Sequence, residues 1–168
     1  MSGLDLGSER RSLWKPIVVA TAVAVTLATV GGLLTDVGPW YQNLRTPSWK
    51  PPDWAFGPAW TTIFVLAVVS AVSAWRNAAD AVAQRQVVVL FAFNACLNVL
   101  WSTLFFALRR PDWALWEVGL LWLAIALPMV VLWRRTRLAS ACLLPYLLWV
   151  SFAAILNLSV VRLNAPFG

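Results

Sequence analysis

The segment Pro47–Trp60 reads Pro-Ser-Trp-Lys-Pro-Pro-Asp-Trp-Ala-Phe-Gly-Pro-Ala-Trp and directly precedes a long apolar run. Its fourteen residues include four prolines and three tryptophans. Because proline lacks a backbone N–H and fixes φ, no regular helix or central strand is expected until the last proline is passed. Tryptophan favours the boundary between membrane and water, where its N–H finds a partner. A stiff aromatic segment at such a boundary is suited to covering or lining a ligand pocket.

The composition of the whole chain indicates a membrane protein. Of its 168 residues, 61% are hydrophobic and only 12% are charged, whereas a soluble domain carries about 25% charge. The net charge is +6, but the basic residues stand in short clusters between apolar runs. Multi-pass membrane proteins place charge in this way, and nucleic-acid-binding domains gather it in a patch. We therefore expect a lipid bilayer as a partner, and no nucleic acid.

Five uncharged runs are separated by charged residues: 16–35, 54–75, 86–108, 118–133 and 138–161. A transmembrane helix requires about 20 mainly apolar residues, and the fourth run reaches this length if it extends back to Trp113, with Glu117 near the interface. The predicted fold is an all-α integral membrane bundle of five transmembrane helices. We assign the bundle to residues 14–164, between a disordered tail at 1–13 and a short tail at 165–168.

The distribution of basic residues predicts the orientation. The N-terminus and the second and fourth connections carry eight of the thirteen Lys and Arg residues, and the opposite face carries five. The positive-inside rule then places the N-terminus on the inner, cytoplasmic side and the proline-rich loop outside.

Two of the predicted helices carry polar and aromatic side chains on one face. Asn94, Asn98, Trp101 and Phe105 recur at helical spacing in the third run, and the fifth run repeats the pattern with Tyr146, Trp149, Ala153 and Asn157. An amide in hydrocarbon is costly unless it is paired, so both stripes should face the bundle interior. The amides then either join helices to one another or line a pocket, and the tryptophans either pack or contact ligand. In the second run, Trp60, Phe64, Ala67 and Ala71 form a similar stripe.

Small residues in the first run predict self-association. Ala20, Ala24 and Ala28 recur every four residues and lead to Gly31, and small residues let helices approach closely in lipid. We expect a homodimer. Cys96 and Cys142 lie inside apolar runs and are interpreted as small, buried apolar side chains.

The sequence lacks the residues that most hydrolytic enzymes and metal sites use. It contains no histidine and no cluster of carboxylates. A Ser/His/Asp triad is therefore impossible and a resident metal is not expected. We predict no catalytic residues of the acid–base kind.

Several spaced motifs resemble the translocator protein family, also called tryptophan-rich sensory proteins or the TspO/MBR family. In chain order the motifs are Gly32-Leu33, Trp40-Tyr41-x-x-Leu44, the segment from Pro47 to Thr61, Leu97-Asn98-x-x-Trp101 with Phe105-Phe106, Pro145-Tyr146-Leu147-x-Trp149, Leu156-Asn157 and Arg162-Leu163-Asn164. The resemblance implies a five-helix bundle, often a homodimer, whose pocket binds porphyrins and related hydrophobic small molecules. No covalent cofactor is implied, and porphyrin or haem would be the ligand. The lining residues carried over by motif are Trp49, Trp54, Asn98, Trp101, Tyr146, Trp149, Ala153 and Asn157.

The resemblance leaves three functions open. A regulatory or sensory porphyrin-binding protein is our main interpretation, and a porphyrin transporter and a photo-oxidative, porphyrin-degrading protein are the alternatives. For the last, Trp54 and Trp149 would be the reacting tryptophans. The chain departs from the family at Phe64, where tyrosine is frequent, and at Leu158, where the animal sterol-recognition pattern has tyrosine.

Overall fold

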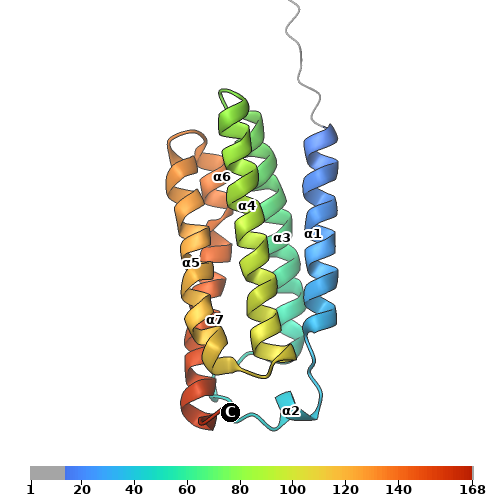
Figure 1. Cartoon of the computed structure of the whole chain (residues 1–168), viewed down its shortest axis with the longest axis vertical. Coiled ribbons are helices and arrows are strands. Elements are labelled where there is room, and N and C mark those ends of the chain that lie inside the picture. Colours follow the sequence, from blue (N-terminus) through green and yellow to red (C-terminus); the bar gives the residue numbers. More distant parts are fainter. Residues whose placement is uncertain (1–13, 168) are drawn as a thin grey trace, which may run out of the picture.

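Five long helices run roughly alongside one another in the computed structural model, which describes residues 14–167 (Figure 1). Five spans are long and apolar enough to cross a membrane: Trp14–Leu34, Asp53–Arg76, Ala81–Ala107, Pro111–Trp133 and Arg137–Asn164. Over the described range no strand occurs. The predicted all-α, five-helix membrane fold is confirmed, and the tail predicted at 1–13 lies outside the described residues, as does Gly168.

The five spans are divided into shorter elements at their ends. In chain order these are α1 (Trp14–Leu34), α2 (Pro39–Gln42), η1 (Asp53–Ala55), α3 (Phe56–Arg76), α4 (Ala81–Ser102), η2 (Thr103–Ala107), α5 (Pro111–Trp133), α6 (Arg137–Cys142) and α7 (Leu144–Asn164). The break at Leu143 between α6 and α7 precedes Pro145, which lies in the first turn of α7, where a missing N–H is tolerated.

Two helices begin earlier than the apolar runs suggest. α4 starts at Ala81, five residues before the run, because Asp80 caps it: the side chain accepts a hydrogen bond of 2.7 Å from the Ala83 N–H. α5 starts at Pro111, since proline fits a first helical turn. α5 therefore begins six residues before Glu117, and Glu117 lies inside the helix.

Asp80→Ala should destabilise the protein by about 1 kcal/mol, because it leaves a donor of the first turn of α4 without its cap. Thermal unfolding in mild detergent measures this as a lower melting temperature. Asp80→Asn keeps an acceptor oxygen and serves as the control. Equal losses in the two variants would show that the cap is not the cause.

The connection from α4 to α5 is a tight turn built on a π-helical segment, η2. The Leu108 N–H donates to the Thr103 carbonyl and the Arg110 N–H to the Leu104 carbonyl, each at 2.9 Å. Arg109 between them has φ 55°, the left-handed region that non-glycine residues seldom adopt. A π-segment widens a helix locally and often accompanies functional sites.

The ends of the bundle differ in structure. The start of α1 and the α3–α4 and α5–α6 connections lie at one end, and the long loop with α2 lies at the other, beside the end of α7 (Figure 1). At the loop end, Trp40 and Tyr41 of α2 pack on Phe105 and Phe106 of η2, with ring centroids 6.2 and 5.8 Å apart. The assignment of the loop end to the outer side stays a prediction.

The buried core lies mainly where α5 meets α4, α6 and α7. Leu121, Ile125 and Leu132 of α5 and Val150 of α7 are almost fully buried there. By contrast, no residue of α1 is buried, and this helix packs mostly against α3 at the edge of the bundle (Figure 1). The loose attachment of α1 leaves room for a cavity on its inner side.

The expectation that both cysteines are buried is wrong. Cys96 is exposed on the outside of α4, and Cys142 is half-buried. In a membrane bundle the outer helix faces meet lipid, so a small apolar side chain is accommodated there as readily as in the core. An apolar run alone therefore does not tell which of its residues face inward.

Candidate functional site

A large cavity of about 810 Å³ lies between α1, α3, α4, α5 and α7. Its lining is predominantly apolar, and at the loop end Tyr41 and Asp53 contribute to it. Ligand pockets typically have volumes of about 300–1,000 Å³ and mostly apolar walls with a few polar groups. The cavity has the size and the character of such a pocket.

The tryptophans of three helices form one wall of this cavity. Trp60 of α3 stacks on Phe64 one turn later, with ring centroids 5.6 Å apart and an interplanar angle of 29°. Its ring also meets the Trp149 ring of α7 edge-on at 6.5 Å. Trp101 of α4 lines the same cavity and stacks on Phe105 at 5.1 Å. The rings hold one another in place before any ligand arrives.

Small residues of α1 form another part of the cavity lining. Ala24, Ala28, Gly31 and Gly32 all line the cavity. A Cβ atom added at either glycine would meet no atom within 4 Å. Most of the small-residue stripe that predicted self-association thus supplies room in the cavity. A homodimer stays a prediction, without support from this stripe.

The eight residues predicted from the sequence fall into three groups. Asn98, Trp101, Trp149 and Ala153 line the cavity. Tyr146 and Asn157 are buried behind the wall, and Trp49 and Trp54 are exposed on the proline-rich loop.

The two buried amides serve different purposes. The Asn98 side chain donates to the Tyr146 hydroxyl at 3.0 Å, joining α4 to α7, and Asn98 also lines the cavity. Asn157, with its amide oriented to satisfy both partners, donates to the Pro111 carbonyl at 3.0 Å and accepts from the Leu115 N–H at 3.1 Å. Asn157 therefore attaches α7 to the start of α5, and its role is to join helices.

The structure brings Trp60 next to Trp149, and leaves Trp54 outside the cavity lining. Trp54 is 76% exposed, because it lies in η1 before the helical register of α3 begins. Trp49 packs edge-on against Phe152 of α7 with ring centroids 5.8 Å apart, and it does not line the cavity. The sequence signal for Trp60 was its spacing of four residues from Phe64 on a helix face, a stronger guide than its place in the proline-rich motif.

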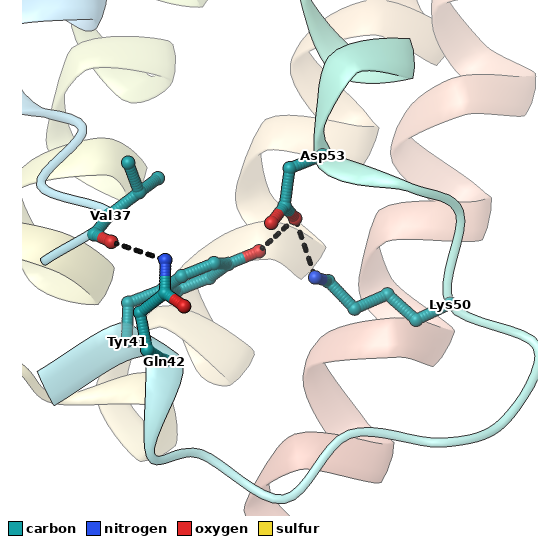
Figure 2. Close-up of polar contacts among 5 residues, drawn as sticks. All are labelled: Val37, Tyr41, Gln42, Lys50 and Asp53. Carbon is teal, nitrogen blue, oxygen red and sulfur yellow. Dashed lines mark hydrogen bonds and ion pairs between the residues drawn. The ribbon is translucent and has the colours of Figure 1, made fainter. Parts of the chain in front are cut away.

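Three polar side chains between α1 and α3 contact one another across the loop (Figure 2). The Tyr41 hydroxyl donates to an Asp53 carboxylate oxygen at 3.1 Å, and the Lys50 ammonium donates to the same oxygen. Lys50 also lies 5.0 Å from the centre of the Tyr41 ring. Earlier in the loop, Arg45 is bound to Asn164 at the end of α7. The Arg45 N–H donates to the Asn164 side-chain oxygen at 2.9 Å, and the Asn164 amide nitrogen donates to the Arg45 carbonyl at 2.8 Å.

Burial and these contacts shift the pKa values of Tyr41 and Lys50 in the loop. Burial raises the pKa of Tyr41 above its ordinary value, although Lys50 acts in the opposite direction. Burial alone would lower the pKa of Lys50, but its contacts with Asp53 and Tyr41 outweigh this and raise it.

A pH dependence of stability follows from these two shifts. A group whose pKa is raised in the folded state stabilises the protein below its unfolded pKa and loses this effect as the pH rises through the folded pKa. The melting temperature should therefore fall above about pH 10, where free Tyr and Lys side chains begin to titrate. The melting temperature of Tyr41→Phe, which lacks the hydroxyl, should fall less steeply over this range. Parallel curves for the two proteins would contradict the assignment.

Comparison with known proteins agrees with this architecture. Residues 18–163 match the sequence profile of the TspO/MBR family. The chain belongs to this family. It is 40% identical over 129 residues to the tryptophan-rich protein TspO of Chlorobaculum tepidum, covering 74% of this chain and 79% of the relative. It is 32% identical over 151 residues to the tryptophan-rich sensory protein of Cereibacter sphaeroides, with 90% and 92% covered.

The similarity extends to an animal member of the TspO/MBR family. The translocator protein of Sus scrofa is 34% identical over 158 residues, which cover 90% of this chain and 91% of that protein. The region that matches the family profile, residues 18–163, includes the second, third and fourth spans, nearly all of the first and fifth, the loop between α1 and α3, and the residues that line the cavity. The resemblance drawn from the motifs is confirmed, and the protein is an integral, multi-pass membrane protein.

Proposed function

We propose that this protein binds a porphyrin-type tetrapyrrole in the cavity and serves a regulatory or sensory role in the membrane. The observation that carries the proposal is the wall of Trp60, Trp101 and Trp149 around an apolar volume of about 810 Å³. Rings at several helices offer faces and edges to a large, flat, conjugated molecule, and each aromatic contact adds about 0.5–1.5 kcal/mol beyond burial.

The position of the cavity supports a hydrophobic ligand. Val25 of α1 and Val65 of α3 line the cavity and are both more than half exposed. Exposed lining residues indicate that the cavity is open at α1 and α3, so an apolar molecule dissolved in the bilayer would have a short way into the site. The name of the relative from Cereibacter sphaeroides, a tryptophan-rich sensory protein, supports the sensory part of the proposal.

An optical titration of the purified protein with protoporphyrin tests the proposal. Saturable quenching of tryptophan fluorescence, with a matching shift of the porphyrin absorption band, is expected at a stoichiometry of one per chain. A structurally unrelated membrane protein in the same detergent is the control for partition into micelles. Equal, non-saturating changes in both proteins would refute porphyrin binding.

One observation favours a second activity at the same site, the light-dependent breakdown of bound porphyrin. The ring centroids of Trp60 and Trp149 lie 6.5 Å apart in edge-on contact, and both residues line the cavity, so two oxidisable indoles would lie next to each other against a bound macrocycle. Loss of protoporphyrin absorbance under light and oxygen, with and without the protein, distinguishes this activity from binding alone. Photobleaching at the same rate in both samples would exclude it.

Trp54→Ala should change protoporphyrin affinity by less than about threefold, because a ring that is 76% exposed and lies outside the lining contributes little burial to a ligand. The titration described above measures the effect. A loss of tenfold or more would show that the loop folds Trp54 onto the ligand, as the motif alone implies.

A further inference from the structure

The loop end of the cavity carries a charged group on an otherwise uncharged lining. Tyr41 and Asp53 contribute to the lining there, and among the described residues Asp53 is the only charged one that lines the cavity. The Asp53 side chain is 53% exposed, so this end of the cavity meets water. A cavity with an apolar body and one charged, water-accessible end suits an amphiphilic ligand.

Lys50 places a positive charge beside these two lining residues. Its ammonium group donates to Asp53 Oδ1, the oxygen that also accepts from the Tyr41 hydroxyl (Figure 2). The same group lies 5.0 Å from the centre of the Tyr41 ring, and the Lys50 side chain is only 17% exposed. An ammonium group has three N–H donors. The bond to Asp53 uses one, which leaves up to two for a ligand at the loop end of the cavity.

The neighbouring arginines are paired away from the cavity. Arg109 forms an ion pair with Asp36 at 3.9 Å, and Arg110 pairs with Asp112. Neither acidic partner lines the cavity. Over residues 14–167, Lys50 is the one basic residue whose side chain has a hydrogen bond, ion pair or ring contact to a lining residue. It is therefore the cation placed to meet a negative charge on a ligand.

The proposed class of ligand supplies such a charge. Protoporphyrin carries two propionate side chains at one edge of its ring, and an ordinary carboxylic acid is ionised at neutral pH. Burial of an unpaired carboxylate in an apolar cavity is very costly, so the acid edge should point to the loop end. Contacts with Asp53 and Tyr41 raise the pKa of Lys50, so the lysine keeps its charge at neutral pH.

We infer that Lys50, held by Tyr41 and Asp53, determines specificity as a subsite for a ligand carboxylate, so that the protein selects tetrapyrroles with free acid side chains over their neutral esters. Lys50 can donate to a ligand carboxylate while it stays bonded to Asp53 Oδ1. The negative charge of Asp53 opposes the acid, and the charge of Lys50 offsets it. The inference rests on the proposed porphyrin binding and adds the class of tetrapyrrole to it.

Two variants that break the same ion pair should change acid binding in opposite directions. Lys50→Met keeps the length of the side chain without its charge. It should weaken protoporphyrin binding about fivefold relative to protoporphyrin dimethyl ester, the scale of a partly screened ion pair. Asp53→Asn removes the opposing charge and should strengthen protoporphyrin binding relative to the ester by about twofold. If the cluster only holds the loop together, both variants lose the same contact and neither changes the preference for the acid.

Fluorescence titration with the two porphyrins measures the ratio of acid to ester affinity in each variant. Each porphyrin partitions into detergent equally in all samples, so this effect cancels when ratios are compared between variants. Arg45→Met is the matched control, because it removes a charge from the same loop and keeps the backbone bonds to Asn164. Its ratio should stay within about 1.5-fold of the wild type, since a distant exposed charge is screened. An unchanged ratio in Lys50→Met, or a lower ratio in Asp53→Asn, would overturn the inference.

Ionic strength provides a second readout. Added salt should weaken protoporphyrin binding to the wild type more than to Lys50→Met, and should leave ester binding unchanged. Equal salt effects on acid binding in the two proteins would contradict the role of Lys50. The ester also separates this inference from the proposed function. If the wild type binds neither compound, porphyrin binding itself is refuted. If it binds both and the ratio is the same in all variants, only the carboxylate subsite is refuted.

Discussion

Trp149→Ala should weaken protoporphyrin binding by about 10–100-fold. The variant removes a ring that lines the cavity and meets Trp60 edge-on. Aromatic contact contributes about 0.5–1.5 kcal/mol and full burial of a large apolar side chain about 1.5–3 kcal/mol. Because Trp149 already packs against neighbouring rings without a ligand, the truncation should remove only part of these two contributions to the binding free energy. Each 1.4 kcal/mol of binding free energy corresponds to a tenfold change in affinity.

The control for Trp149→Ala is the same truncation of an outward-facing tryptophan. Trp116 on α5 is 84% exposed, so Trp116→Ala should leave protoporphyrin affinity unchanged. Fluorescence titration of both variants, each checked for a normal melting temperature, gives the comparison. Unchanged affinity in a folded Trp149→Ala protein would remove Trp149 from the site.

Ala153→Leu should reduce protoporphyrin affinity by about tenfold or more with little change in thermal stability. Ala153 lines the cavity, one turn beyond Trp149, so the added carbons project into space that the ligand would occupy. The sequence alone leaves two interpretations of this alanine, as a cavity position or as a helix contact. The structure favours the first.

The adjacent alanine supplies a matched control. Ala154 packs against the buried core, so Ala154→Leu should overpack it and cost about 1–3 kcal/mol of stability. Melting temperature and affinity, measured on both variants, should separate the two positions. The opposite pattern, with Ala153→Leu melting early and binding normally, would show that Ala153 is a packing position.

The five helices were predictable because hydrocarbon imposes one simple requirement, a run of about 20 apolar residues with its backbone hydrogen bonds satisfied internally. Their ends were less predictable, since Asp80 reads as a boundary by its charge but acts as the cap of α4. Which way a helix faces was harder still. Apolar side chains suit both lipid and core, so Cys96 could not be placed from its run.

The candidate site was half predictable for the same reason. Helical spacing correctly grouped Asn98 with Trp101, and Trp149 with Ala153, and all four line the cavity. The contribution of α1 was missed, because alanines at four-residue spacing read equally well as a contact between helices. Trp60 was undervalued against Trp54, since a motif records residue types and not the point at which a helix fixes their direction.

The most direct test of the account is a structure of the protein with protoporphyrin bound, determined in a lipid environment. The account predicts density for the macrocycle between α1 and the wall of Trp60, Trp101 and Trp149, within the cavity of about 810 Å³. Density for the macrocycle on the outer surface, against Trp54 or the lipid-facing side of α5, with the cavity occupied by side chains or lipid, would contradict it.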